Sequence, residues 1–108
     1  MKIAYLSYPY SDNPKKRTEE VVEIAATILK KHNIFSIVPH LAVDPLRDMV
    51  FEIDLLEAEL KIISHCDIFI VGSKTLSEGM KWELAYAQYL NKPVYYYDEG
   101  DGELYEAP

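Results

Sequence analysis

The sequence predicts an α/β fold, a three-layer sandwich with helices on both faces of a mainly parallel sheet. Short apolar runs rich in β-forming residues recur along the chain, at 3–8, 34–38, 68–71 and 94–97. Segments in which apolar residues follow helical spacing separate these runs. Strands that alternate with helices pair in parallel through right-handed crossovers. We therefore expect a sheet of four or five strands, with four of them in the order 2-1-3-4, and we interpret the C-terminal tail as a loop or an arm.

Size and composition narrow the class of protein. The chain has 108 residues, enough for one compact domain, and we assign 1–98 to that domain and 99–108 to an acidic tail. The net charge of −7 argues against binding to a nucleic-acid polymer. Cys66 is the only cysteine, so no internal disulfide can form. No apolar run approaches the roughly 20 residues that cross a bilayer, so we expect a soluble cytoplasmic protein without membrane contact.

The first half of the chain contains two strands and one helix with clear boundaries. Asn13 is a preferred N-cap residue, and Pro14 follows at the first helical position. Apolar residues at helical spacing continue through Lys31, after which His32-Asn33 ends the helix. The second strand is expected to end at Pro39-His40, near the carboxyl end of the first.

A loop through Asp44-Pro45 is expected to lead into a long helix. One face of that helix carries Leu46, Met49, Ile53, Leu60 and Ile63, and another carries Phe51, Leu55 and Ile62. Because apolar residues on two faces require two covering surfaces, we expect this helix to contact another subunit in a homo-oligomer.

The last helix contains the strongest functional signal. Ser77 is a preferred N-cap residue, and apolar residues cluster on one side of Glu78–Leu90 at roughly 100° per residue. Glu83 falls in the middle of that apolar side. An ionised carboxylate there costs several kcal/mol unless it is paired, hydrogen-bonded or open to a cavity. Glu83 is therefore either a functional group or a buried brace paired with a lysine, an arginine or a tyrosine.

In doubly wound sheets of the flavodoxin- or Rossmann-like kind, ligands bind at the carboxyl ends of the strands, near the switch point. Four segments converge there: 7–10, Pro39-His40, Gly72-Ser73 and the start of the 77–83 helix. Ser77 and the free amides of Glu78, Gly79 and Met80 form a donor nest suited to a phosphate or a hydroxyl group. A carboxylate beside such a nest suits attack on an anomeric carbon, as in retaining glycosidases.

Other candidates at this edge have two interpretations each. His40 either contacts the ligand or is a structural histidine bonded to a loop. Tyr8 and Tyr10 either stack on a base or pack a loop. The three histidines show no ligand spacing, so we expect no metal site.

The pattern Ser77-x-Gly79-x-x-x-Glu83-Leu84-Ala85-x-Ala87, followed by Asn91-Lys92-Pro93-Val94, resembles the nucleoside 2-deoxyribosyltransferase-like superfamily. The opening Tyr5-Leu6-Ser7-x-Pro9-Tyr10 and the segment Val38-Pro39-His40 resemble a small branch of it. The resemblance extends from the start of the chain to Tyr97 and implies no cofactor.

The resemblance implies roles for individual residues. Glu83 matches the nucleophile that attacks C1′ of the sugar and displaces the base, and Tyr5 matches a first-strand tyrosine that positions it. Ser77 falls where nucleotide N-glycosidases bind phosphate, and Gly79 matches the glycine of the motif. Glu59 stands where relatives carry an aspartate that binds sugar hydroxyls, although helical periodicity favours Glu57 as the inward residue. The expected substrate-binding set is Ser7, Tyr8, His40, Glu59, Gly72, Ser77, Gly79 and Met80.

Two functions fit this sequence. The first is an enzyme that acts on the N-glycosidic bond of a nucleoside or nucleotide, as a 2-deoxyribosyltransferase or an N-glycosidase. The second is a non-catalytic nucleotide-binding or sensor module with the same fold, favoured by Glu59 in place of aspartate and by the short chain.

Overall fold

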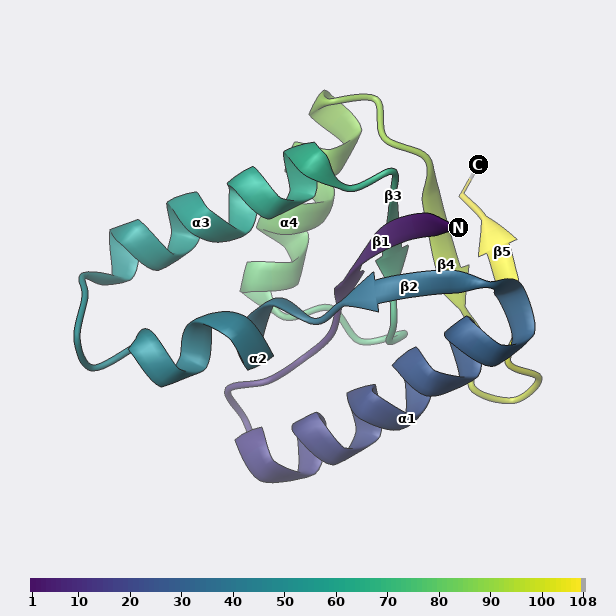
Figure 1. Ribbon diagram of the computed structural model, residues 1–108, viewed down its shortest axis with the longest axis horizontal. Coiled ribbons are helices and arrows are strands. Elements are labelled where there is room, and N and C mark those ends of the chain that lie inside the picture. Colours follow the sequence, from purple (N-terminus) through teal and green to yellow (C-terminus); the bar gives the residue numbers. More distant parts are fainter. Residues whose placement is uncertain (108) are drawn as a thin grey trace.

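The computed structural model describes residues 1–107, which form a five-stranded sheet with helices on both faces (Figure 1). The strands are β1 (Lys2–Ser7), β2 (Ile34–Ile37), β3 (Ile68–Val71), β4 (Val94–Tyr97) and β5 (Leu104–Glu106). They lie in the order β2-β1-β3-β4-β5, and only β4 and β5 pair antiparallel. The predicted α/β class and the order 2-1-3-4 are confirmed, with β5 added at the β4 edge.

The helices are α1 (Pro14–His32), α2 (Pro39–Val43), the short 3-10 helix η1 (Asp44–Leu46), α3 (Glu52–His65) and α4 (Glu78–Tyr89). α1 covers one face of the sheet, and α3 and α4 cover the other (Figure 1). Helix α1 begins as predicted, because the Asn13 side chain accepts a hydrogen bond from the Lys16 amide. It ends at Asn33, which adopts the left-handed conformation with φ of 56°.

Alternation along β1 divides the core into two layers. Ala4, Leu6 and Tyr8 belong to the apolar cluster beneath α1, whereas Tyr5 belongs to the cluster beneath α3 and α4. Successive side chains of a strand point to opposite faces, so Tyr5 and Ser7 both face α4. This alternation positions two hydroxyl groups of β1 toward the last helix.

The segment from Pro39 to Phe51 differs from the sequence prediction. Pro39 opens α2 instead of only ending a strand, since proline is well suited to a first helical position. The predicted long helix is interrupted, because Asp44-Pro45 enters η1 and α3 begins only at Glu52. Met49 and Phe51, predicted to lie on two helix faces, instead lie in the connection with exposed fractions of 82% and 79%.

Part of the predicted acidic tail joins the sheet. The chain turns after Tyr97, with Gly102 in the left-handed region at φ of 71°, and returns as β5. Tyr96 pairs with Tyr105 across the β4–β5 ladder. Pro108, the last residue of that predicted tail, lies outside the described residues.

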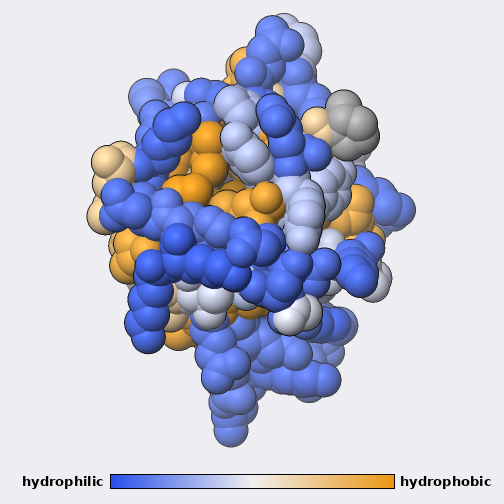
Figure 2. All heavy atoms as spheres, turned by 90° about the vertical axis from the view of Figure 1, so that its right-hand side faces the viewer, coloured by the Kyte–Doolittle hydropathy of each residue, from blue (hydrophilic) through white to orange (hydrophobic). Residues whose placement is uncertain are grey.

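Figure 2 views the face that carries the N-terminus and β5, where apolar side chains lie in a hollow between hydrophilic ones. A cavity of about 510 Å³ on this face is lined by Met1, Lys2, His32, Asn33, Ile34, Ile68, Tyr95 and Leu104. The histidine is already bonded to the carbonyl of Gly102. This hollow lies at the amino ends of β1 to β3, away from the edge where ligands of such sheets bind.

Within residues 1–107, no helix is long and apolar enough to cross a membrane.

Candidate active site

Glu83 lies on the inner face of α4 and contacts two hydroxyl groups of β1. The Tyr5 hydroxyl donates to Oε2 of Glu83, and the Ser7 hydroxyl donates to Oε1 over 2.8 Å. The Glu83 side chain is only 8% exposed. Tyr5 is fully buried and stacks on Phe69 of β3, with ring centroids 5.5 Å apart, so its hydroxyl is fixed in place. The strand spacing Tyr5-x-Ser7 therefore holds both oxygens of one buried carboxylate.

The protonation of Glu83 depends on two opposing effects. Burial raises the pKa of Glu83, while the hydrogen bonds from Tyr5 and Ser7 lower it by stabilising the ionised form. Burial and the Glu83 charge raise the pKa of Tyr5 well above its usual value of 10.0, so Tyr5 stays a neutral donor. Over residues 1–107, no lysine or arginine forms an ion pair with Glu83. The two hydroxyl donors thus stabilise the Glu83 carboxylate in place of a lysine or an arginine.

Glu83 also opens onto a pocket of about 460 Å³ at the carboxyl ends of β1 and β2. The pocket is walled by the β1–α1 connection, α2, the segment around η1, α3 and the start of α4. Its lining residues are Tyr8, Tyr10, Ser11, Pro39, His40, Arg47, Glu52, Glu59, Ser77, Glu78, Gly79, Met80 and Glu83. The structure therefore brings together most of the predicted site, and it places Tyr5 and Ser7 behind Glu83 rather than in the pocket lining.

The first turn of α4 forms one wall of this pocket. Ser77 caps the helix, and its hydroxyl oxygen accepts a hydrogen bond from the Met80 amide over 3.2 Å. The amides of Glu78 and Gly79 have no partner inside the helix, as in every helix start. A Cβ added to Gly79 would meet nothing within 4 Å except the Ser77 hydroxyl oxygen, at 4.0 Å. The space beside Gly79 is thus open to a ligand.

Glu59 of α3 supplies a second carboxyl group to the pocket, while Glu57 is exposed. Burial and repulsion from the Glu83 charge raise the pKa of Glu59 to about 7, although Arg47 opposes this shift. Two carboxyl groups of one pocket therefore differ in environment, because only Glu83 has two hydroxyl donors. Such a pair can combine an ionised group with a protonated one near neutral pH.

The sequence analysis missed Arg47, which follows η1 and lines the pocket. Its Nε donates to Asp44 over 3.2 Å, and its Nη1 donates to Glu52 over 2.8 Å. Asp44 precedes Arg47 by three residues, which is the spacing of a helical ion pair and the one local signal for its position. Glu52, which also lines the pocket, carried no comparable signal, whereas Tyr10 was already a candidate for stacking on a base.

His40 is buried beside Arg47. The side chain is 6% exposed, and its ring stacks on Tyr10 with centroids 4.2 Å apart. Burial lowers the pKa of His40 to about 4, with Arg47 adding to the shift and Asp44 opposing it. Within the described residues, Nε2 of His40 is buried without a hydrogen-bond partner.

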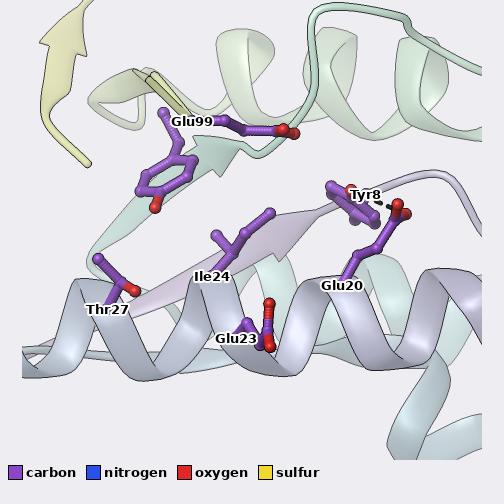
Figure 3. Close-up of a pocket in the computed structure, with 7 residues that line it drawn as sticks. Tyr8, Glu20, Glu23, Ile24, Thr27 and Glu99 are labelled. Carbon is purple, nitrogen blue, oxygen red and sulfur yellow. Dashed lines mark hydrogen bonds between the residues drawn. The ribbon is translucent and has the colours of Figure 1, made fainter. Parts of the chain in front are cut away.

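Tyr8 separates this pocket from a second hollow of about 340 Å³ beneath α1, drawn in Figure 3. Figure 3 shows Glu20, Glu23, Ile24 and Thr27 rising from α1 toward Tyr8 and Glu99. The Tyr8 hydroxyl donates to Glu20 of α1 over 3.1 Å (Figure 3), and Tyr8 belongs to the apolar cluster beneath α1 rather than the one beneath α4. Of the two interpretations for Tyr8, the geometry agrees with a packed wall.

Gly72 does not line the pocket of Glu83. A Cβ there would lie 3.0 Å from Cδ1 of Tyr8 and 3.2 Å from the backbone oxygen of Ser7. Gly72 therefore allows the end of β3 to approach β1 and the Tyr8 ring closely, which is a packing role. In the part of the chain that the structure describes, no group of three or more His, Cys, Asp or Glu residues could hold a metal ion.

A family model described as "Domain of unknown function (DUF7768)" matches residues 2–97. No curated protein matches the sequence. The structure is similar to a 2-desoxiribosyltransferase from Leishmania mexicana, with a TM-score of 0.68 and 20% sequence identity over 90% of this chain. This chain covers 64% of that relative, slightly less than two thirds of its length.

Two further solved structures are similar. One is a 2-deoxyribosyltransferase from Bacillus psychrosaccharolyticus, with a TM-score of 0.68 and 23% identity, covering 88% of this chain and 71% of that one. The other is the CMP N-glycosidase BcmB from Clostridium botulinum, with a TM-score of 0.55 and 17% identity, covering 93% and 74%. These likenesses confirm the nucleoside 2-deoxyribosyltransferase-like fold that the sequence motifs indicated.

Proposed function

The chain belongs to the family described as "Domain of unknown function (DUF7768)", and we propose that it is an enzyme acting on the N-glycosidic bond of a nucleoside or nucleotide. One observation carries this proposal: Glu83 is buried and held by two hydroxyl groups, yet it faces an open pocket. A carboxylate that only braced the fold would gain nothing from a cavity beside it. The deoxyribosyltransferase and N-glycosidase names of structurally similar proteins agree with this chemistry.

In the proposed reaction, a carboxylate oxygen of Glu83 attacks C1′ of the sugar. The bond between C1′ and the base nitrogen breaks, and its electron pair leaves with the base. Water or a second base then attacks C1′, the ester bond to Glu83 breaks, and the carboxylate is restored. Tyr5 and Ser7 are positioning residues, because their hydrogen bonds fix the carboxylate and keep it ionised.

Glu59 is the proposed proton donor to the departing base. Because its pKa is raised to about 7, Glu59 is protonated in a large share of the protein molecules near neutral pH. The neighbouring charge of Glu83 is one cause of this shift, so the proton is held where the base leaves. Binding of sugar hydroxyls, which the resemblance implied for Glu59, is compatible with this role.

The first turn of α4 is the proposed site for a 5′-phosphate or a sugar hydroxyl. The free amides of Glu78 and Gly79 point out of the helix start, where the helix dipole also favours negative charge. The Ser77 hydroxyl accepts from Met80 and retains its own proton for a ligand oxygen. Glu83 lies one helical turn further along, a spacing that suits C1′ beside the carboxylate.

The alternative is a non-catalytic nucleotide-binding module, and one observation favours it. Both oxygens of Glu83 already accept hydroxyl hydrogen bonds, as those of a bracing carboxylate would. The same pocket would then bind a nucleotide without breaking it.

The first experiment incubates the protein with ribo- and deoxyribonucleosides and their 5′-monophosphates, with and without a second base as acceptor. Free base is followed by chromatography, beside Glu83→Ala. We expect base release from at least one substrate by the native protein and none by the variant. Nucleotide binding without base release from any substrate would favour the non-catalytic module.

We expect kcat/KM to follow a bell-shaped pH profile. The rate should rise as Glu83 ionises, at a pH above its usual 4.5, and fall above about pH 7 as Glu59 loses its proton. Because the two carboxyl groups interact, the apparent pKa values of the two limbs belong to the pair rather than to single residues. Glu59→Gln should remove the alkaline limb of the profile. The measurement is kcat/KM from about pH 4 to about pH 9.

Glu57→Gln is the matched control, since Glu57 is an exposed carboxylate on the same helix. It should keep both limbs. An alkaline limb that persists unchanged in Glu59→Gln would exclude Glu59 as the proton donor.

We also propose that the protein is a homo-oligomer, held together through the connection before α3 and its first turn. Met49, Phe51 and Ile53 have exposed fractions of 82%, 79% and 63%, which is unusual for large apolar side chains of a monomer. Phe51→Asp should lower the mass measured by light scattering to that of a monomer, whereas Val22→Asp on exposed α1 should not. A monomeric native protein would refute this assignment.

A further inference from the structure

His40, which lines the pocket of Glu83, carries a polar atom that no group among the described residues satisfies. Nε2 of His40 is buried and, within residues 1–107, has no hydrogen-bond partner. The ring cannot turn freely, because the side chain is 94% buried and stacks on Tyr10. Buried polar atoms are nearly always paired, so the unpaired Nε2, on a residue that lines the pocket, is a candidate partner for a ligand atom.

Arg47 presents unused donors in the same pocket. Asp44 binds its Nε and Glu52 binds its Nη1, which fixes the plane of the guanidinium group. Among the described residues, Nη2 of Arg47 has no partner in a hydrogen bond or an ion pair. Arginine donates and never accepts, and the Arg47 side chain is 36% exposed, so its free Nη2 is available to an acceptor on a ligand. Among residues 1–107, Arg47 is also the one lysine or arginine that lines the pocket.

We name Tyr10, His40 and Arg47 the polar corner of the pocket. Glu59 lines the same pocket, and the charges of Glu83 and Arg47 act on its pKa in opposite directions. The start of α4 lies one turn before Glu83 on the other side. If phosphate or sugar oxygens bind at α4 and C1′ meets Glu83, the rest of the lining, which includes Glu59 and the polar corner, is left for the base.

We propose that Arg47 and His40 select substrates whose base carries an oxo group, such as cytosine, uracil or guanine, over adenine. This inference rests on the proposed function and specifies its substrate class. An oxo oxygen accepts from the guanidinium group, and the adjacent ring nitrogen lies within reach of a second donor. Adenine has no oxo group, and its amino group would point one donor at another. Discrimination by such contacts is about tenfold to hundredfold.

Tyr10 completes the polar corner with an aromatic face. The neighbouring Asp44 carboxylate raises the pKa of Tyr10, so Tyr10 stays neutral. The same carboxylate accepts a hydrogen bond from Nε of Arg47, so Asp44 lies beside two members of the corner. The neutral His40 ring can donate from one nitrogen and accept at the other, which allows it to complement either neighbour of an oxo group.

The test measures binding to the Glu83→Gln protein, so that no substrate is consumed. Calorimetric titrations use cytidine, uridine, guanosine and adenosine, each also as the 5′-monophosphate, and ribose 5-phosphate as a ligand without a base. We expect at least tenfold tighter binding of the oxo-bearing compounds than of the adenine compounds. Adding Arg47→Gln should remove this preference and leave the affinity for ribose 5-phosphate unchanged.

Two further variants keep the result interpretable. Lys61→Gln makes the same charge change at an exposed position of α3 and should keep the preference. Arg47→Lys retains the charge but loses the planar donor pair, so it should keep most of the affinity and lose most of the preference. Binding of ribose 5-phosphate shows that each variant is folded and that its phosphate and sugar site at the first turn of α4 is intact.

The outcomes distinguish the base preference from the glycosidic function on which it rests. Adenine compounds that bind as tightly as the others, while ribose 5-phosphate also binds, overturn the base preference and leave the glycosidic function standing. A preference that survives Arg47→Gln overturns the role of Arg47. Failure of every compound to bind, ribose 5-phosphate included, overturns the proposed function and this inference with it.

Discussion

Glu83→Gln is expected to abolish base release while the free energy of unfolding stays equal or increases. Loss of the nucleophile should lower kcat by a factor on the order of 10³ to 10⁶. The stability prediction follows from the pKa of Glu83, which burial raises, so holding the ionised group in the fold has a cost. Glutamine keeps the shape and removes the charge. Chromatography of the released base measures the first effect, and urea unfolding followed by circular dichroism measures the second.

The stability of this variant also separates a functional glutamate from a brace. The difference in unfolding free energy between the variant and the native protein should depend on pH. The native protein loses stability as pH rises through the raised pKa of Glu83, whereas the glutamine variant does not. Glu57→Gln provides the control at an exposed site. Two results together would identify Glu83 as structural: retained turnover in Glu83→Gln, and a loss of unfolding free energy of about 3 kcal/mol or more. A loss of that size is typical when one partner of a buried charged pair is removed.

Gly79→Leu is expected to weaken ligand binding by about a hundredfold, equivalent to roughly 3 kcal/mol of binding free energy, without unfolding the protein. The protein itself leaves room for a side chain at Gly79, since the nearest atom to an added Cβ is 4.0 Å away. That room lies in the pocket beside the free amides of α4, so a leucine would occupy the position of the ligand. Calorimetry with the best substrate measures the loss, in the Glu83→Gln background.

Gly79→Ala should separate folding from binding at the same position. Replacing glycine by alanine inside a helix adds about 0.5 to 1 kcal/mol of stability, with a smaller gain expected this close to the helix start. Ala26→Leu, a similar enlargement on the exposed side of α1, should change neither binding nor stability appreciably. If Gly79→Leu binds substrate as tightly as the parent protein, the first turn of α4 is not part of the ligand site.

The parts of the structure that the sequence predicted well have local signals. The first and last long helices begin at Asn13 and Ser77, whose side chains cap them as expected. The position of Glu83 on the buried side of α4 follows from periodicity alone. Its partner Tyr5 was expected only from the family resemblance, because a strand residue and a helix residue 78 positions apart share no local pattern.

The polar corner could not be predicted in the same way. Pro39 was interpreted as the end of a strand and Pro45 as part of a loop before a long helix, although proline equally opens short helices. The correct arrangement depends on the contacts of Arg47 with Asp44 and Glu52. Ion pairs across a connection contribute no hydrophobic periodicity, so the Asp44–Arg47 spacing indicates the ion pair but not the pocket that Arg47 lines.

The properties of Glu59 illustrate a second limit. Helical periodicity favoured Glu57 as the inward residue of α3, but the helix begins six residues later than Leu46, where the expected helix started. The pKa of Glu59 depends on burial and on the charge of Glu83, which lies on another helix. Such a shift is a property of the assembled pocket and not of any segment.

The measurement that tests the central claim most directly is the anomeric configuration of the sugar product. The native protein is incubated with its best β-nucleoside or nucleotide in the presence of methanol as an acceptor, and the methyl glycoside is examined by NMR. Attack by Glu83 followed by attack of the acceptor inverts C1′ twice, so the account predicts a β-glycoside. An α-glycoside would mean a single displacement without a covalent intermediate, and would contradict Glu83 as the nucleophile.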